Sequence, residues 1–190
     1  MAEVREDAEF YATSGGGVTL SGGEPLRQHE FASAILQQCK AEGYHTALDT
    51  CGHVHWKTFE QVLPYVDLLL YDLKHVSSEI HQRYTGVPNR LIIENLRRLS
   101  RYGVPIEVRM LIIPGINDGR DVIQAAAWLL ASMDNITNVR LLPYHRLAGS
   151  KYVKLGREDT MPDVDPPSAE QMREIAGWIG SCGLQAVYPA

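Results

Sequence analysis

The sequence predicts an α/β fold built on a parallel sheet. Strand-like segments alternate with helix-like segments along the 190 residues, and the strand-like segments are near-continuous runs of Val, Ile and Leu. Such strands are typical of a parallel sheet whose faces are covered. Six strand-like segments are too few for a closed eight-stranded barrel. The pattern therefore favours an open or partial barrel, or a doubly wound sheet.

The expected elements are short and evenly spaced. The strands are expected at residues 17–20, 45–50, 66–75, 105–115, 138–145 and 184–188. The helices are expected at residues 2–12, 28–43, 56–66, 90–103, 117–133 and 168–183. The longest irregular segment, residues 147–167, is interpreted as a solvated connection in preference to a binding loop.

Helix boundaries follow from apolar spacing and terminal residues. Phe31, Ile35 and Leu36 are expected on one helical face, and Gly43 is expected to end that helix. Asn89 can cap the helix at 90–103, whose apolar stripe is Leu91, Ile92, Leu96 and Leu99. Ser168 and Gln171 form the S-x-x-Q pattern of a capping box.

Composition excludes several classes of protein. The net charge of −5 argues against broad binding to nucleic acid or to anionic membranes, which needs a basic face. No apolar run approaches the roughly 20 residues of a membrane span. The opening residues are acidic and polar, unlike a signal peptide, and the three cysteines lack metal-ligand spacing. We therefore predict a cytoplasmic protein with reduced thiols.

Polar residues follow five consecutive strands. They are Ser21, Gly22, Gly23 and Glu24; Asp49, Thr50 and Cys51; Asp72, Lys74 and His75; Arg109, within its strand; and Tyr144 and His145. Because the carboxyl ends of parallel strands meet at one edge of the sheet, this pattern predicts a cofactor or substrate site there.

The strand at 66–75 carries charge that needs an explanation. Asp72 and Lys74 point to the same side because side chains alternate along a strand. They form either a structural ion pair or a receptor for a zwitterion, in which the Asp accepts from an ammonium and the Lys donates to a carboxylate. Glu24 and the carbonyls of Gly22 and Gly23 would accept from the same ammonium. No phosphate-loop or dinucleotide fingerprint is present.

Five segments in order carry a family resemblance. "GGGVTLSGGEPL", "HTALDTCG", "LLLYDLKH", "VRMLIIPGIND" and "LLPYH" resemble the radical S-adenosylmethionine (AdoMet) activating enzymes of glycyl radical enzymes, such as pyruvate formate-lyase-activating enzymes. The resemblance covers nearly the whole chain. It implies a partial (β/α) barrel, AdoMet at its carboxyl edge, and a [4Fe-4S] cluster that cleaves AdoMet to a radical. That radical takes hydrogen from a glycine of the partner enzyme.

The same resemblance implies the ligands of AdoMet. They are Gly22, Gly23 and Glu24 at its amino group, Asp72 and Lys74 of "DLK", Asp49 of "DT", the strand Arg109, and His145 of "PYH". It assigns no catalytic side chain. Cys51, which stands where the family often has Asn, is interpreted as a bystander.

One departure concerns iron. The family's C-x-x-x-C-x-x-C motif is absent, and Cys39, Cys51 and Cys182 are too far apart to form one cluster loop. We therefore expect a single domain, residues 1–190, that is a fragment without the barrel's first strand and cluster loop. The cluster would belong to the longer parent only, and the fragment would bind little iron and be inactive alone.

Protein partners are also implied by the resemblance, and two other functions are consistent with the residues. The resemblance implies a glycyl radical enzyme as protein substrate and flavodoxin or ferredoxin as electron donor. A Schiff-base (class I) aldolase or lyase would instead use Lys74 as nucleophile, with Asp72 or His145 carrying the proton. A module that only docks a partner is a third interpretation.

Overall fold

The computed structural model describes residues 1–145 and 163–189. The described residues divide into two compact units, residues 1–72 with 91–107 and residues 73–90 with 108–190. Most of the segment 147–167 lies outside the described residues. Whether the chain forms a single domain over 1–190 stays a prediction.

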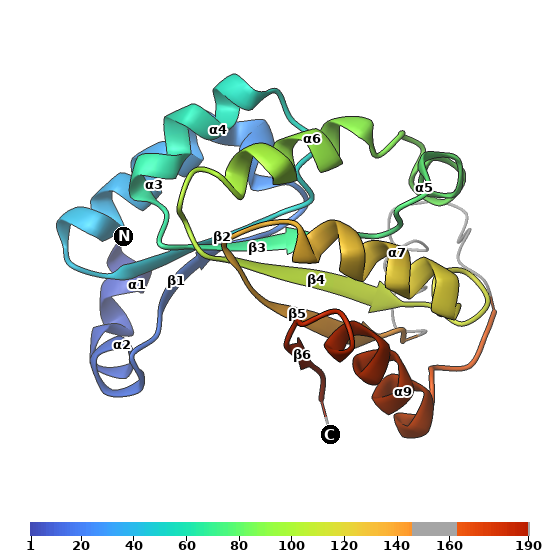
Figure 1. The fold of residues 1–190 in the computed structure, drawn as a ribbon. Coiled ribbons are helices and arrows are strands. Elements are labelled where there is room, and N and C mark those ends of the chain that lie inside the picture. Colours follow the sequence, from blue (N-terminus) through green and yellow to red (C-terminus); the bar gives the residue numbers. More distant parts are fainter. Residues whose placement is uncertain (146–162, 190) are drawn as a thin grey trace. The chain divides into compact units, whose positions relative to one another are not determined.

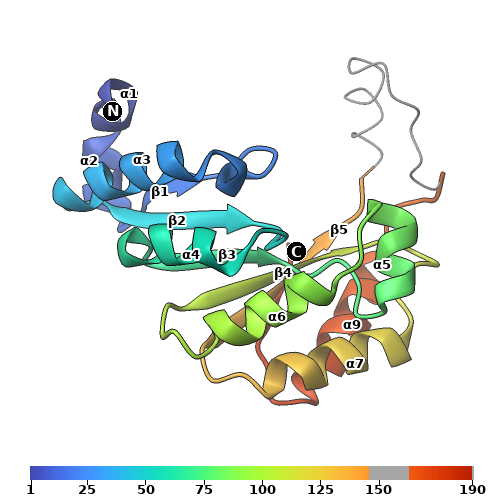
Figure 2. The same cartoon turned by 90° about the horizontal axis from the view of Figure 1, so that it is seen from above.

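The first unit contains three strands with helices and 3₁₀ turns between them (Figure 1). The strands are β1 (Gly17–Leu20), β2 (His45–Thr50) and β3 (Leu68–Asp72). The helices are α1 (Ala2–Glu6), α2 (Ala8–Ser14), α3 (His29–Ala41), α4 (Trp56–Val62) and α6 (Arg90–Leu99), with 3₁₀ turns η1 (Pro25–Gln28) and η2 (Leu63–Tyr65). Helix α3 packs against α4, β1 and β2, and Figure 2 shows α3 and α4 along the same strands.

The second unit contains the remaining elements. They are α5 (Ser78–Thr85), most of β4 (Ile106–Ile112), α7 (Arg120–Ala131), β5 (Ile136–Pro143), α9 (Ala169–Gly180) and β6 (Ala186–Val187). Helices α7 and α9 pack side by side, as Figures 1 and 2 show, and α9 also contacts β5 and β6. Ser168 and Gln171 form the predicted capping box at the start of α9.

Among the described residues the backbone pairing forms one six-stranded sheet in the order β1-β2-β3-β4-β5-β6. The β1–β2, β2–β3 and β5–β6 pairs run parallel. Sequential neighbours in a parallel sheet need a crossover after every strand, and a helix follows each of β1 to β5. This confirms the α/β prediction, and β1 and β2 have the predicted bounds.

The burial pattern separates a partial barrel from a doubly wound sheet. In β3, Leu69 and Tyr71 are fully buried, whereas the alternate residues Leu68, Leu70 and Asp72 are half-buried. In β4 Ile106, Val108, Met110 and Ile112 are buried on one face. The other face carries the buried Glu107, the half-buried Arg109 and the exposed Leu111. A doubly wound sheet buries both faces of its strands under helices. A second face that is open and partly charged fits the interior of an open barrel.

Several expected helices differ from the structure. The helix at 2–12 is two helices that meet at Asp7. Phe31 does not share the buried face of α3 and is 64% exposed, because the buried stripe runs through Ala32, Leu36 and Cys39. Helix α5 was not expected at all, although Ser77 caps its first turn and Gly86 ends it in the left-handed region.

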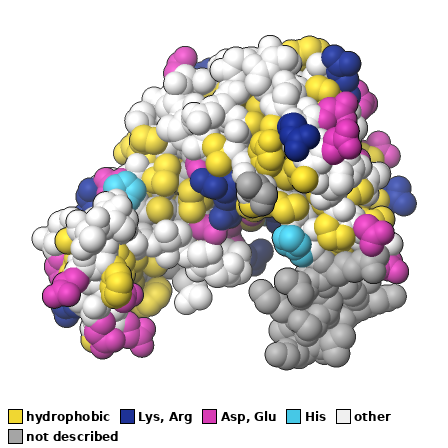
Figure 3. Space-filling view, turned by 90° about the horizontal axis from the view of Figure 1, so that it is seen from below, with side chains coloured by type: hydrophobic (Ala, Val, Ile, Leu, Met, Phe, Trp, Pro, Cys, Tyr) yellow, Lys and Arg dark blue, Asp and Glu magenta, His cyan; other side chains and the backbone are white. Residues whose placement is uncertain are grey.

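Surface composition is mixed. Among the described residues six large hydrophobic side chains are exposed: Phe10, Phe31, Tyr84, Tyr102, Leu111 and Trp128. Figure 3 shows hydrophobic, basic and acidic side chains interspersed on one face. In the part of the chain that the structure describes, no helix has both the length and the apolar character needed to cross a membrane.

Candidate functional site

The turn that follows β1 carries the first predicted site residues. Gly22 and Gly23 are exposed, and Gly22 has a φ of 136° that L side chains rarely adopt. A Cβ added at either glycine would meet no described atom within 4 Å. The hydrogen bonds of Ser21 and Glu24, at its two ends, hold this turn.

Glu24 anchors the end of the turn. One carboxylate oxygen, Oε1, accepts from the Leu26 amide at 3.1 Å and from Thr50 Oγ1 at 2.9 Å. The other, Oε2, accepts from Thr50 Oγ1 and from both the amide and the thiol of Cys51, each at 3.0 Å. An ionised carboxylate has about four acceptor sites, so these donors occupy most of its capacity. The turn after β1 is thereby fastened to the end of β2.

Asp49 fastens the start of the same turn. Ser21 Oγ donates to Asp49 Oδ2 at 2.7 Å. Parallel register sets Asp49 of β2 opposite Leu70 of β3, and Asp72 lies two residues further along the same face. Both aspartates are half-buried. The ends of β2 and β3 therefore present two carboxylates, and the first of them, Asp49, is bonded to Ser21 of the exposed turn.

The loop after β2 is fixed from beneath. The buried Asn95 of α6 donates its side-chain amide to the carbonyls of Gly52 at 2.9 Å and Val54 at 2.8 Å. Gly52 has a φ of 72°, and a Cβ there would lie 1.8 Å from Tyr71 Oη. The buried Tyr71 hydroxyl in turn donates to the Ile92 carbonyl at 2.7 Å. Burial raises the pKa of Tyr71 well above its usual value, so the hydroxyl stays a donor.

In the second unit, two predicted site residues line a cavity of about 550 Å³. These are Lys74 and His145, both exposed. The apolar part of the wall comes from α5, β4 and the loop after β4, through Ile80, Leu111 and Ile116. This volume falls within the range of small-molecule sites, which are concave and mostly apolar with a few polar groups.

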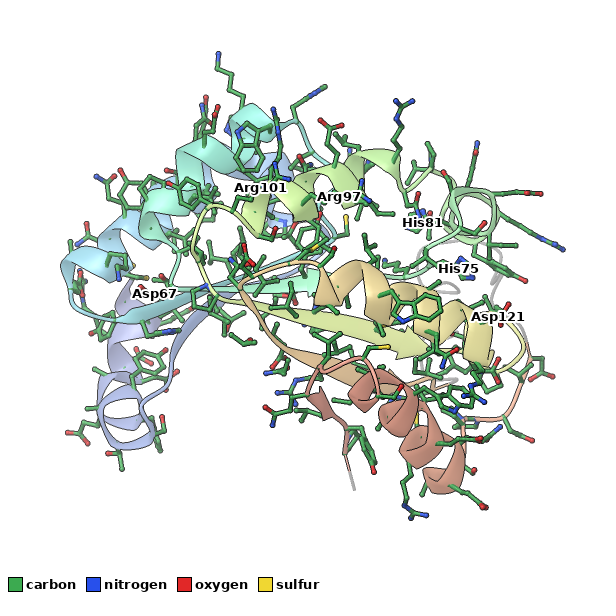
Figure 4. All side chains as sticks on the ribbon, in the orientation of Figure 1. Asp67, His75, His81, Arg97, Arg101 and Asp121 are labelled. Atoms are coloured by element: carbon green, nitrogen blue, oxygen red, sulfur yellow. The ribbon has the colours of Figure 1, made fainter. Side chains whose placement is uncertain are left out.

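The polar groups at the base of this cavity are held by internal hydrogen bonds. The Asn117 side-chain amide donates to the carbonyls of Lys74 and Leu111, and its oxygen accepts from the Ile113 amide. His81 Nδ1 lies 2.7 Å from the Val87 carbonyl. A carbonyl only accepts, so this nitrogen carries the proton. His75 Nδ1 instead accepts from the Ser77 amide. Figure 4 shows both histidines near α5.

The cysteines do not fit an iron–sulfur cluster. Cys39 is buried in α3, and burial raises the pKa of its thiol, which disfavours the thiolate that a metal needs. The Cys51 thiol is engaged by Glu24, and Cys182 follows α9 in the other unit. Within residues 1–145 and 163–189, no three His, Cys, Asp or Glu side chains form a metal-binding group.

Comparison with known proteins identifies the family. Residues 1–129 match the radical SAM superfamily. The chain belongs to the radical SAM superfamily. A crystal structure of a domain of pyruvate-formate lyase-activating enzyme from Bacteroides vulgatus superposes on this radical SAM chain with a TM-score of 0.78 and 35% identity. That match covers 92% of this chain and 99% of the other.

Two curated relatives are activating enzymes. Pyruvate formate-lyase 1-activating enzyme of Escherichia coli K12 is 36% identical over 190 residues, which are 99% of this chain and 77% of the relative. Isethionate sulfite-lyase activating enzyme of Desulfovibrio desulfuricans is 46% identical over 163 residues, 85% of this chain and 52% of the relative. The radical SAM chain thus spans about half the length of the isethionate sulfite-lyase activating enzymes it matches. The family predicted from the five sequence segments is confirmed.

The predicted ligands divide between the two units. Gly22, Gly23, Glu24, Asp49 and Asp72 lie in the first unit, where hydrogen bonds join the ends of β1 and β2. Lys74, Arg109 and His145 lie in the second unit, where Lys74 and His145 line one cavity and Arg109 is half-buried on β4.

Sequence reasoning missed the residues that support the site. Thr50 was noted only for its position, and Asn95 was passed over although it is a polar residue inside the apolar stripe of α6. The Cys51 thiol lies 3.0 Å from Glu24 Oε2, and the interpretation of Cys51 as a bystander toward AdoMet stays a prediction.

Proposed function

We propose that this chain is the AdoMet-binding part of an activating enzyme that generates a glycyl radical on a partner enzyme. One observation carries the proposal. An exposed Gly22–Gly23 turn is fastened at Ser21 to Asp49 and at Glu24 to Thr50 and Cys51, beside the carboxylates of β2 and β3. This is an acceptor-rich edge suited to the ammonium group of an amino acid. The activating enzymes among its relatives support the assignment.

The roles of individual residues follow from their chemistry. The carbonyls of Gly22 and Gly23, with Asp49 and Asp72, would accept from the ammonium group of AdoMet. AdoMet, when bound and reduced, supplies the hydrogen-abstracting group. Lys74, Arg109 and His145 remain predicted ligands of the same cofactor: the two cations suit its carboxylate, and the imidazole suits its adenine. Glu24 mainly holds the turn in place, because its oxygens already accept hydrogen bonds from the Leu26 and Cys51 amides.

The remaining parts of the proposal concern partners. The three cysteines do not fit the ligand set of a [4Fe-4S] cluster. A glycyl radical enzyme as protein substrate, a flavodoxin or ferredoxin as electron donor and a cytoplasmic location are part of the same proposal. The Schiff-base alternative gains no support, since Lys74 is exposed and a nucleophilic lysine is normally desolvated.

An amide chemical-shift titration of the ¹⁵N-labelled chain with AdoMet tests the binding role. We expect shifts concentrated at Gly22, Gly23 and the residues after β2, with affinity in the millimolar range. Asp49→Asn should weaken binding by about tenfold, because one charge-assisted bond is worth roughly 1.5 kcal/mol. His45→Ala, at the opposite end of the same strand, is the matched control and should bind as the wild type does.

Two outcomes would overturn the proposal. One is the absence of any saturable shift at the ends of β1 and β2. The other is an Asp49→Asn variant that binds AdoMet as well as the His45→Ala control.

A further inference from the structure

The Cys51 thiol has a defined hydrogen-bonding partner. Its Sγ lies 3.0 Å from Glu24 Oε2, and its own amide donates to the same oxygen at the same distance. An ionised carboxylate can only accept, so the contact is attractive only while the thiol keeps its proton. A thiolate at that distance would repel the carboxylate.

We propose that Cys51 is a positioning residue: its protonated thiol holds the Glu24 carboxylate and, through it, the turn of residues 21–24. The link to AdoMet rests on the proposed function. The link to the turn rests only on contacts in the structure. Gly22 and Gly23 are exposed, and a Cβ added at either would meet no described atom within 4 Å, so the turn depends on the contacts of Ser21 and Glu24 at its two ends. Fixing Glu24 therefore fixes where the carbonyls of the two glycines lie.

Glu24 keeps other hydrogen-bond donors when the thiol is removed, and these limit the expected effect. The Cys51 amide and Thr50 Oγ1 stay in place when the thiol is removed, so the carboxylate keeps partners but loses the one that comes from the side chain at position 51. We therefore expect local loosening, not unfolding. Serine has a hydroxyl donor at the same place, so it should restore what alanine removes.

Two readouts follow that need no AdoMet. The Leu26 amide donates to Glu24 Oε1, so its hydrogen exchange reports how firmly the carboxylate is held. The alkylation rate of Cys51 reports the charge beside the thiol, because only the thiolate reacts. Glu24→Gln removes that charge and should speed alkylation of Cys51 by about tenfold.

The experiment uses the reduced chain with Cys51→Ala, Cys51→Ser and Glu24→Gln variants. Cys182→Ser is the matched control, since its thiol is half-buried, lies 3.7 Å from the Trp178 carbonyl and belongs to the other unit. Leu26 exchange is followed by NMR, and iodoacetamide labelling is followed by peptide mass mapping. We expect Leu26 to exchange about threefold to tenfold faster in Cys51→Ala and at the wild-type rate in Cys51→Ser and Cys182→Ser.

A titration with AdoMet then separates the two claims. Weaker binding in Cys51→Ala with rescue in Cys51→Ser supports the positioning role. If the wild type shows no AdoMet binding, the proposed function fails while Leu26 exchange and Cys51 alkylation still decide the contact. Wild-type exchange in Cys51→Ala, or unchanged alkylation in Glu24→Gln, overturns the proposal.

Discussion

At Gly52 a single added methyl group should be strongly destabilising. Its φ of 72° lies in the left-handed region, which costs an L residue roughly 1–2 kcal/mol. An alanine Cβ would also lie 1.8 Å from Tyr71 Oη and 2.2 Å from Tyr71 Cζ. The Tyr71 ring is fully buried and its hydroxyl donates to the Ile92 carbonyl. The ring can therefore move away only by losing packing contacts or that hydrogen bond.

The magnitude follows from three contributions. Overpacking in a core costs about 1–3 kcal/mol, and the lost Tyr71–Ile92 hydrogen bond costs about 1 kcal/mol. With the backbone term, Gly52→Ala should lose about 3–6 kcal/mol. For a chain of this size that corresponds to a Tm lower by about 10–20 °C. Thermal and urea unfolding followed by circular dichroism measure the change.

Gly43→Ala is the matched control. Gly43 has a φ of 83° in the same unit, but an added Cβ there meets no described atom within 4 Å. It should show only the backbone cost of roughly 1–2 kcal/mol. The second check is a double-mutant cycle with Tyr71→Leu, which should be less than additive with Gly52→Ala. Equal losses in the two glycine variants would refute the steric argument.

Three further changes test other contacts. Asn95→Leu removes two bonds to the loop after β2 and should cost about 2 kcal/mol, seen in urea unfolding. Arg5 and Gln38 lower the pKa of Glu42 to about 2. Because this lies below the unfolded value of roughly 4.3, the stabilisation is present above pH 4.3 and is lost as pH falls toward 2. Glu42→Gln should flatten the stability profile in that window. Ser168→Ala removes the cap of α9 and should cost about 1 kcal/mol, measured as a lower Tm.

Controls separate these effects from general damage. Glu9→Gln changes an exposed carboxylate on α2 and should leave the acid profile as it is. Ser78→Ala changes an exposed serine of α5 and should leave the Tm within about 1 °C. An Asn95→Leu variant of wild-type stability would show that the two amide bonds contribute nothing net. A Ser168→Ala variant of wild-type Tm would contradict the capping estimate.

The sequence was most informative where local chemistry decides structure. The strands at 17–20 and 45–50 and the Ser168–Gln171 cap were predicted with correct residues, because apolar runs and capping patterns act over a few neighbours. Helix α5 was missed because Ile80 is its only strongly apolar residue, so the periodic signal is weak. Its terminal residues, Ser77 and Gly86, are the signals that would have found it.

The sequence predicted which residues lie at the carboxyl edge of the sheet, but it predicted less well what each of them contacts. The end of each strand is visible in the sequence, so the candidates could be gathered from the expected sheet edge. Which donor bonds which acceptor depends on contacts between residues far apart in the chain. Thr50 and Cys51 lie 26 and 27 residues from Glu24, and Asn95 lies 43 residues from Gly52. No local pattern records such pairs, so a polar residue in an apolar stripe was passed over.

The hydrogen bonds of Glu24 decide whether its carboxylate is available to a ligand. A glutamate after two glycines reads from sequence as a ligand for a cation, since its charge is the obvious feature. In the structure its oxygens already accept from Leu26, Thr50 and Cys51, so adding an ammonium would require giving up some of those bonds. The two glycines give the chain freedom to turn their carbonyls outward, and the anchored residue that follows removes that freedom again. At this edge, Asp49 and Asp72 supply the negative charge that would attract an ammonium group. Glu24 fixes the position of the turn that carries the glycine carbonyls.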